Sequence, residues 1–249
     1  MGLDGDHIEP NGADRLMSFR LKAVVKESHG APIVGTVFCK PSQSEMCTNL
    51  LASVGGNQLT VYDDSHMGEN FAVVAHYVHE TAGGAGADLA AVAWVPIPRA
   101  KRLNSQEGPK IAVATTDGAI NIISIVESQV VASLQSRTQD IFSMMACAYG
   151  EEQVFLLVLM KSGRIDVWDI ENGHLAAEIL QDASAMSLLT ENDDEILLGL
   201  NDGRILRCKF SELLSHNVDE SFGDEIGRVH RAVRKLVRER IVCSVCNDI

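Results

Sequence analysis

Four stretches of the chain share one order of apolar and polar positions. Each has a run of apolar residues, then a turn of two or three Gly, Asn, Asp or Ser residues, then a strand-like alternation. Alternation with a period of two predicts a β-strand, and these turn residues readily adopt the positive φ that tight hairpins need. We therefore expect four β-hairpins, at Asn49–Asp63, Lys110–Ser124, Phe155–Asp169 and Glu195–Lys209.

The hairpins recur at a fairly regular distance. The residues that correspond in the four copies are Leu59, Ile120, Ile165 and Ile205. They are separated by 61, 45 and 40 residues, and the two shorter spacings match the ~40–45-residue period of WD-type propeller blades. Two stretches rich in Gly, Pro and charge, 79–88 and 96–110, explain the longer spacing as loops inserted between strands.

A further apolar stretch precedes each hairpin and predicts another strand. These stretches are Pro32–Pro41, Asp88–Ile97, Asp140–Tyr149 and Asp182–Glu191. Together with an outer connecting strand they give four strands per repeat. A single four-stranded blade does not bury both of its faces, so neighbouring blades stack around an axis. The expected fold class is all-β, a WD40-type β-propeller.

The last part of the chain has two interpretations. Residues 228–240 interleave Arg and Lys with Val and Leu, which is compatible with a basic amphipathic helix for a membrane surface or a partner groove. The stretch 240–249 instead overlays the fourth hairpin and is rich in Val, Ile and Cys, which favours a strand. We favour the first half of a fifth blade. The chain then stops in mid-blade at Ile249, with about four and a half blades present.

The expected domain organisation follows from these patterns. Residues 1–18 are acidic and polar and are expected to form a disordered tail. The propeller is expected to occupy 19–249, with blades at roughly 19–80, 81–135, 136–180, 181–215 and a partial fifth at 216–249.

Composition and charge narrow the function classes. The chain has 249 residues, 46% hydrophobic residues and a formal net charge of −13. That charge argues against a nucleic-acid binder that neutralises phosphates, and it leaves basic partners open. The N-terminus does not have the pattern of a signal peptide, and no apolar run has the length of a membrane span. We interpret the six scattered cysteines as buried free thiols in a reducing compartment.

The first repeat resembles the extra-sex-combs / embryonic-ectoderm-development (ESC/EED) family of WD-repeat proteins. The matching features are the run KESHG at 26–30, the residues Pro32, Gly35 and Phe38, and the run SVGGN at 53–57 followed by Val61–Tyr62. The runs AVAW at 91–94 and DGAINIIS at 117–124 add to it, and 229–249 is similar to the start of that family's fifth blade. The resemblance covers about Phe19 to Ile249.

The resemblance implies a function that composition and spacing do not. The family's members are seven-bladed propellers that act as non-catalytic scaffold subunits of Polycomb repressive complex 2 in the nucleus. They bind a helix of the SET-domain methyltransferase on one face, and on the other they hold trimethyl-lysine of histone H3 in an aromatic cage. We therefore expect a chromatin-silencing scaffold that is no enzyme and has no cofactor or metal. Its expected partners are that methyltransferase, other Polycomb subunits and the histone H3 tail, with no membrane and no sequence-specific nucleic acid.

The cage positions can be located in this chain. The resemblance assigns them to Val34 and Ala90, and the other cage aromatics belong to the last blades, beyond Ile249. A quaternary ammonium needs aromatic faces, each worth ~0.5–2 kcal/mol. Since Val34 and Ala90 offer none, we expect the methyl-lysine cage to be degenerate.

Other motif residues are expected to be structural. His29–Gly30 resembles the Gly-His element that opens a WD repeat, and Trp168–Asp169 is a Trp-Asp dipeptide expected to pack between blades. Three further glycines occupy hairpin turns, Gly118, Gly163 and Gly203. The pair Cys243 and Cys246 has CxxC spacing, but there is no second pair to complete a zinc site.

Two other functions remain open. One is a WD40 protein-interaction adaptor in another complex, such as a ubiquitin ligase or an RNA-processing assembly. The other is a hydrolase or lyase that uses the acidic turns at 63–64 and 193–195, which would require several carboxylates to converge at the central channel.

Overall fold

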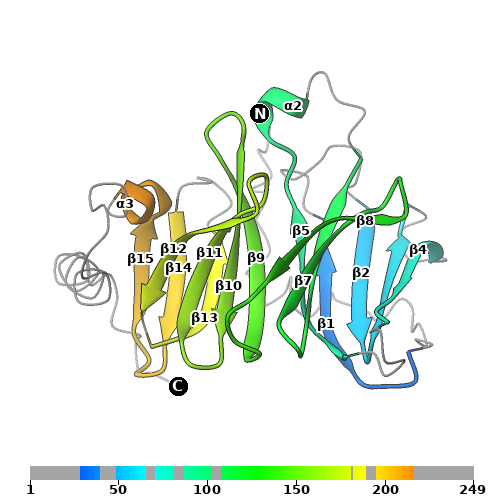
Figure 1. The fold of residues 1–249 in the computed structure, drawn as a ribbon, viewed down its shortest axis with the longest axis horizontal. Coiled ribbons are helices and arrows are strands. Elements are labelled where there is room, and N and C mark those ends of the chain that lie inside the picture. Colours follow the sequence, from blue (N-terminus) through cyan, green and yellow to red (C-terminus); the bar gives the residue numbers. More distant parts are fainter. Residues whose placement is uncertain are drawn as a thin grey trace, which may run out of the picture.

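The chain folds into four antiparallel β-sheets arranged in series (Figure 1). The computed structural model describes residues 29–39, 49–65, 71–80, 87–102, 108–180, 182–188 and 195–215. The first sheet contains β1 (Ile33–Phe38), β2 (Leu50–Gly55), β3 (Gln58–Asp63) and β4 (Ala72–Val78). The second contains β5 (Leu89–Val95), β6 (Lys110–Thr115), β7 (Ala119–Ser124) and β8 (Gln129–Gln135).

The third and fourth sheets continue the same order. The third contains β9 (Ile141–Tyr149), β10 (Gln153–Met160), β11 (Arg164–Asp169) and β12 (His174–Leu180). The fourth contains β13 (Ala183–Leu188), β14 (Glu195–Leu200) and β15 (Ile205–Lys209). The predicted all-β class is confirmed. So are the four predicted hairpins, which are the antiparallel pairs β2–β3, β6–β7, β10–β11 and β14–β15. The strand predicted before each hairpin is present as β1, β5, β9 or β13.

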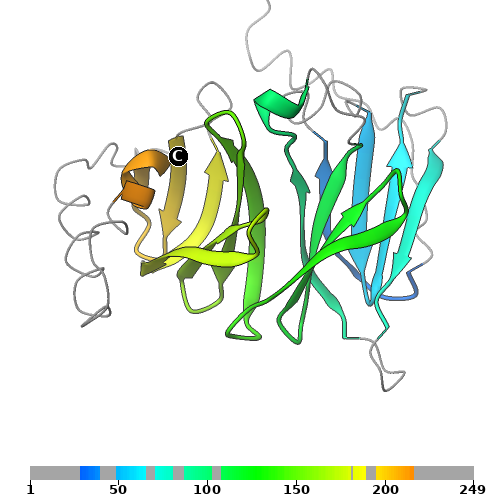
Figure 2. The ribbon, with the colours of Figure 1, turned by 45° about the horizontal axis from the view of Figure 1, so that its top comes forward.

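Neighbouring sheets meet mainly through their first strands. β5 contacts β1 and β9, and β13 contacts β9 and β10. In Figures 1 and 2 the first and last sheets lie at opposite ends of the row. This arrangement is compatible with a β-propeller, and the described residues do not close it into a ring.

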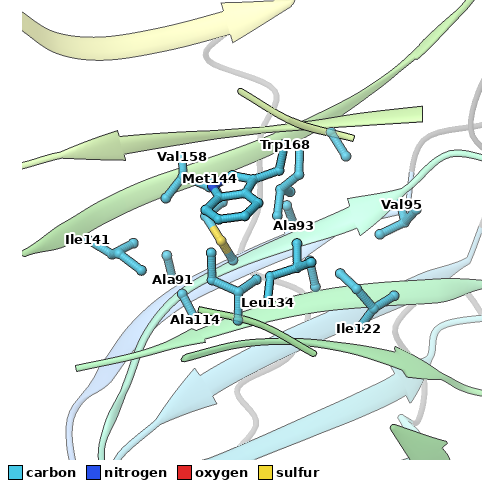
Figure 3. Packing of buried hydrophobic residues seen from close by; sticks show 14 of the residues in the cluster. Ala91, Ala93, Val95, Ala114, Ile122, Leu134, Ile141, Met144, Val158 and Trp168 are labelled. Carbon is cyan, nitrogen blue, oxygen red and sulfur yellow. The ribbon is translucent and has the colours of Figure 1, made fainter. Parts of the chain in front are cut away.

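Each seam between two sheets is a separate apolar cluster. The first seam is centred on Val61, Trp94 and Ile111, and the Trp94 indole N–H donates a hydrogen bond of 3.0 Å to the carbonyl oxygen of Val37 across it. The second seam contains Met144 and Trp168, which Figure 3 shows among the other side chains of this cluster. The third seam contains Leu157, Ile165 and Phe210 with the last sheet.

One row of paired positions faces the preceding sheet in the second, third and fourth repeats. In the second sheet this row is Trp94, Ile111 and Ile123, and all three side chains belong to the first seam. The equivalent row of the third sheet is Ala146, Leu156 and Trp168, and in the fourth sheet it includes Ile196 and Cys208. Trp168 therefore lies between the second and third sheets.

The structure differs from the sequence predictions at two places. A fourth strand was expected in every repeat, but the described part of the fourth sheet has three strands, and β15 is followed directly by α3 (Phe210–Ser215). The run FSELLS has no β-branched residue, and its buried Phe210 packs on Tyr149 and Phe155.

The second difference lies in the predicted loop 96–110. It contains the one-turn helix α2 (Arg99–Arg102), whose residues are mostly good helix formers. The backbone N–H of Ala100 in this turn donates a hydrogen bond of 2.9 Å to the carbonyl oxygen of Glu151.

Several predictions concern parts of the chain outside the described residues. They are the acidic tail at 1–18, the partial fifth blade or basic helix at 216–249, the pair Cys243 and Cys246, and the acidic residues Asp193 and Asp194. In the described ranges, no helix is long and apolar enough to cross a membrane.

Candidate functional site

The first strand of every sheet begins with a β-bulge. The pairing between first and second strands skips one residue at the same place in each repeat. The skipped residues are Val34, Ala90, Phe142 and Ser184, which we call the bulge row. A bulged residue is left out of the ladder and its side chain is re-aimed, and such positions are common beside functional sites. We therefore treat the bulge row as the candidate site.

The bulge row presents apolar groups to solvent. Val34 is 56% exposed and Phe142 is 54% exposed, while Ala90 is half-buried. Ser184 is exposed, and its hydroxyl donates a hydrogen bond of 3.3 Å to the carbonyl oxygen of Gly199. The two positions assigned from the resemblance, Val34 and Ala90, thus occupy equivalent places on neighbouring first strands.

Phe142 is a site residue that the sequence did not single out. It is an exposed aromatic residue at the position equivalent to Val34 and Ala90. Aligning the strands before the hairpins on their leading Asp residues would have placed Phe142 opposite Ala90.

A carboxylate residue immediately precedes three of the four bulged strands. The carbonyl oxygens of Asp88, Asp140 and Asp182 accept hydrogen bonds of 2.8, 2.8 and 3.0 Å from backbone N–H groups in the following hairpin turn. The hydrogen bond from Thr138 lowers the pKa of Asp140, although partial burial opposes it. The Asp182 carboxylate accepts a hydrogen bond of 2.6 Å from the Asn201 side chain. These three acids lie two residues before Ala90, Phe142 and Ser184 in the chain and add negative charge to this end of the sheets, which favours a basic ligand.

The turns at this end of the sheets depend on glycine. Gly118, Gly163 and Gly203 have φ values of 89°, 84° and 84°, in the region that side chains disfavour. In the first of these turns Asp117 accepts hydrogen bonds from the Thr115 hydroxyl and from the backbone N–H of Ala119. The Thr115 bond is the main reason that the pKa of Asp117 is lowered.

His29 links the two segments that carry the family resemblance. Its Nε2 lies 3.1 Å from the hydroxyl of Ser53, and both side chains are buried. Gly30 follows with a φ of 68°, which turns the chain into β1. The described end of the run KESHG, His29–Gly30, therefore meets the run SVGGN through Ser53.

Trp168 and Asp169 have different neighbours. The Trp168 ring fills the second seam (Figure 3). The Asp169 carboxylate accepts hydrogen bonds of 3.0 and 2.8 Å from the backbone and side chain of Asn172, which fixes the turn between β11 and β12. Both contacts maintain the shape of the third sheet.

Two polar networks cross the seams, and sequence reasoning missed both. In the first seam Asn121 donates a hydrogen bond of 3.3 Å to the Tyr77 hydroxyl and accepts one of 2.7 Å from Ser133. The Tyr77 hydroxyl is also 3.1 Å from Nδ1 of His79. Burial raises the pKa of Tyr77, and the Asn121 bond opposes that effect. His76 is hydrogen-bonded to Thr60 instead, so His76 and His79 have different partners.

The second network surrounds a fully buried carboxylate, Asp166. Its Oδ1 lies 2.9 Å from Nε of Arg164, too poorly aligned for a hydrogen bond, while Nη2 of Arg164 donates one of 3.2 Å to Oδ2. Glu178, which pairs with Asp166 across the strands, forms an ion pair of 2.5 Å with Arg137. Burial raises the pKa of Asp166, the Arg164 charge opposes this, and the Glu178 charge adds to it.

Three acidic turn residues are hydrogen-bonded within their own turns, whereas Glu195 forms an ion pair with Arg207 on the neighbouring strand. Asp63 accepts a hydrogen bond of 2.7 Å from the backbone N–H of Ser65, and Asp117 and Asp202 are hydrogen-bonded within two hairpin turns that belong to different sheets. Across the ranges that the structure describes, no three His, Cys, Asp or Glu side chains gather in a way that could hold a metal ion.

Comparison with known proteins does not identify a family for the chain. No protein-family model matches it, and no curated protein matches it.

Proposed function

We propose that this protein is a non-catalytic WD40-type propeller scaffold that resembles the ESC/EED subunit of a Polycomb histone methyltransferase complex. The chain would supply about four and a half of an expected seven blades. Its partners would be the SET-domain methyltransferase and other Polycomb subunits in the nucleus, where the assembly contributes to chromatin silencing.

One observation carries this proposal more than any other. Two runs resemble the family in the first repeat, and the described end of KESHG, His29–Gly30, meets SVGGN through the hydrogen-bonding contact between His29 and Ser53. Four sheets in series with equivalent bulges also support a scaffold, because a row of similar blades offers a long surface for other chains. A propeller-like fold alone supports only a binding module.

Histone reading by a methyl-lysine cage is not part of the proposal. The bulge row has aliphatic side chains at Val34 and Ala90, and Phe142 is its one aromatic residue. We expect a trimethyl-lysine histone H3 peptide and its unmethylated form to bind with equal, weak affinity in a fluorescence titration. Micromolar binding that depends on methylation would show that the cage is functional after all.

Immunoprecipitation of the endogenous protein with mass spectrometry of the whole eluate tests the scaffold function. A SET-domain methyltransferase in the eluate is the expected result, and it should be lost when the bait is the destabilised Trp168→Ala variant. A partner set from a ubiquitin ligase or an RNA-processing assembly would contradict the Polycomb role and favour a general WD40 adaptor, the second candidate.

A further inference from the structure

The fourth sheet lacks the outer strand that the other three sheets have. The outer strands are β4, β8 and β12, and each pairs with the third strand of its sheet. In the fourth sheet the third strand is β15, and among the described residues it pairs with β14 alone. One edge of β15 therefore has no neighbouring strand in this part of the chain.

The backbone of β15 presents alternate residues to this edge. The N–H of Leu200 donates a hydrogen bond of 2.9 Å to the carbonyl oxygen of Arg204 at the hairpin turn. In an antiparallel pair every second residue of a strand exchanges such bonds with its partner, so Leu206 bonds to β14. Ile205 and Arg207 therefore direct their N–H and C=O groups to the other edge. Backbone groups of this kind are a template for a further strand.

Apolar and charged side chains of β15 are uncovered. Ile205 is 40% exposed, whereas the equivalent residues Leu59, Ile120 and Ile165 are at most 1% exposed. The side chain of Arg207 is 50% exposed. A strand beside β15 would cover part of both side chains.

The same edge has an excess of positive charge. Arg204, at the end of the turn, is followed by Arg207 and Lys209 in β15. Arg204 forms an ion pair of 2.6 Å with Asp202, and Arg207 forms one with Glu195. Three cations thus face two carboxylates. An acidic strand at this edge would gain opposite-charge pairs, whereas a basic strand would place like charges beside each other.

The chain outside the described residues contains one segment of suitable charge close to this edge. Residues 217–226, NVDESFGDEI, include four acidic residues and no basic one. They follow α3, which contacts β12 and lies beside the end of β15 (Figure 1), so the chain leaves α3 on the outer side of the fourth sheet. Of the other strand-like stretches, 19–27 and 228–240 are basic, and 240–249 has one basic and one acidic residue.

We infer that the acidic segment 217–226 pairs antiparallel with the free edge of β15 and forms the fourth strand of the fourth sheet. Glu220 and Phe222 lie on one face of such a strand, because side chains alternate. Opposite β15 they match Arg207 and Ile205, as a charge pair and an apolar pair. A segment tethered this closely has an effective concentration on the order of millimolar. The stretches assigned to a partial fifth repeat, 228–240 and 240–249, remain available for that repeat.

Hydrogen exchange of the full chain, resolved to single amides, tests this strand. We expect the amides of Ile205 and Arg207 to exchange at least about tenfold more slowly than in an unstructured peptide of the same sequence. Glu220→Lys combined with Phe222→Asp should abolish that protection. The amide of Leu206 should stay slow in both proteins, because it bonds to β14, and this shows that the variant is folded.

A matched variant and a milder one complete the experiment. Val237→Asp combined with Glu239→Lys makes the same two changes outside the segment and should leave Ile205 protected. Glu220→Lys alone should accelerate exchange at Ile205 by a smaller factor if the double variant unfolds. Fast exchange of Ile205 in the wild type would overturn the proposal. Equal protection in the wild type and the Glu220 and Phe222 variants would also overturn it, because a different strand would then occupy the edge.

Discussion

His29 and Ser53 form a buried polar contact in the first sheet, between residues that are 24 positions apart. A buried hydrogen bond stabilises the native state by about 1 kcal/mol net, and leaving one partner unpaired costs more than removing both. The contact therefore both stabilises the first sheet and specifies how the chain enters β1.

A double-mutant cycle on this pair gives a defined expectation. His29→Ala and Ser53→Ala should each lower the free energy of unfolding by about 1–3 kcal/mol. The double variant should lose less than the sum, with a coupling energy of about 1 kcal/mol measured by urea unfolding. Additive losses would show that the two side chains do not stabilise each other. The exposed side-chain pair in which Gln129 donates a hydrogen bond of 3.0 Å to Glu127 is a suitable reference cycle with little coupling.

The buried carboxyl of Asp166 predicts a pH dependence of stability. A raised pKa means that the folded protein binds this proton more tightly than the unfolded chain does. Below the ordinary Asp pKa of 3.8 the proton on Asp166 stabilises the folded state. As the pH rises from 3.8 through the raised pKa of the folded state, Asp166 ionises and the free energy of unfolding falls. Above that raised pKa the whole contribution is lost. Asp166→Asn should be more stable than wild type at neutral pH, by on the order of 1 kcal/mol.

The advantage of Asp166→Asn should disappear below pH 4, where both proteins are uncharged at this position. Asp202→Asn is the control, because the pKa of Asp202 is shifted in the opposite direction and its effect on stability has the opposite pH dependence. Its hydrogen bond from Arg204 lowers the pKa of Asp202, so that interaction stabilises the wild type at neutral pH and is lost as the pH falls. Thermal melts of the three proteins between pH 3 and pH 7 separate the two effects. If the melting temperatures of wild type and Asp166→Asn changed in parallel with pH, the raised pKa of Asp166 would be contradicted.

At the scale of the elements, the hairpin turns differ in how closely the backbone of another segment approaches their glycines. A Cβ added to Gly118 would lie 2.8 Å from the carbonyl oxygen of Thr138, whereas one added to Gly203 would meet nothing within 4 Å. Both glycines have similar positive φ values, so an alanine at either position would be strained in its backbone to a similar extent. Only the alanine at position 118 would also clash with another part of the backbone.

Alanine substitutions at these two turns should therefore have unequal effects. Gly203→Ala should lower the free energy of unfolding by about 1–2 kcal/mol from the left-handed conformation alone. Gly118→Ala should lower it further, by ~1 kcal/mol or more, because the Thr138 backbone must move. Chemical denaturation measures both variants. Equal losses would mean that the backbone near Thr138 moves away from an alanine at position 118 without a measurable cost in stability.

The sequence predicts the hairpins well because their signals are local. Alternation and turn residues indicate β6 and β7 without reference to any other part of the chain. The bulge row depends on how β1 pairs with β2, and the seam networks depend on which sheets are neighbours. For that reason Val34 and Ala90 were named only through the family resemblance. Phe142 has a sequence signal only by its alignment with Ala90, and the contacts of Asp166 have none. α3 was missed because the period of the repeat suggested another strand.

At the scale of the whole molecule, stability is distributed by the order of the sheets. Among the elements that the structure describes, each sheet packs mainly on its neighbours in the chain, as in other repeat architectures. The second and third sheets are packed on both faces by described elements, and the first and fourth on one face. The hydrophobic clusters therefore make the middle of the row the most stable part.

Hydrogen exchange should follow this order. All residues of β6 and β10 except the first of each strand are buried. β4 has no fully buried residue and forms an outer edge of the first sheet. We expect amides of β6 and β10 to exchange roughly tenfold or more slowly than those of β4, because β4 opens without unfolding the middle sheets. Mass spectrometry of the exchanged peptides measures the difference, and β12, the outer strand of the third sheet, is the internal reference. If β4 were as protected as β6, the four sheets would unfold as one unit, and stability would not decline towards the ends of the row.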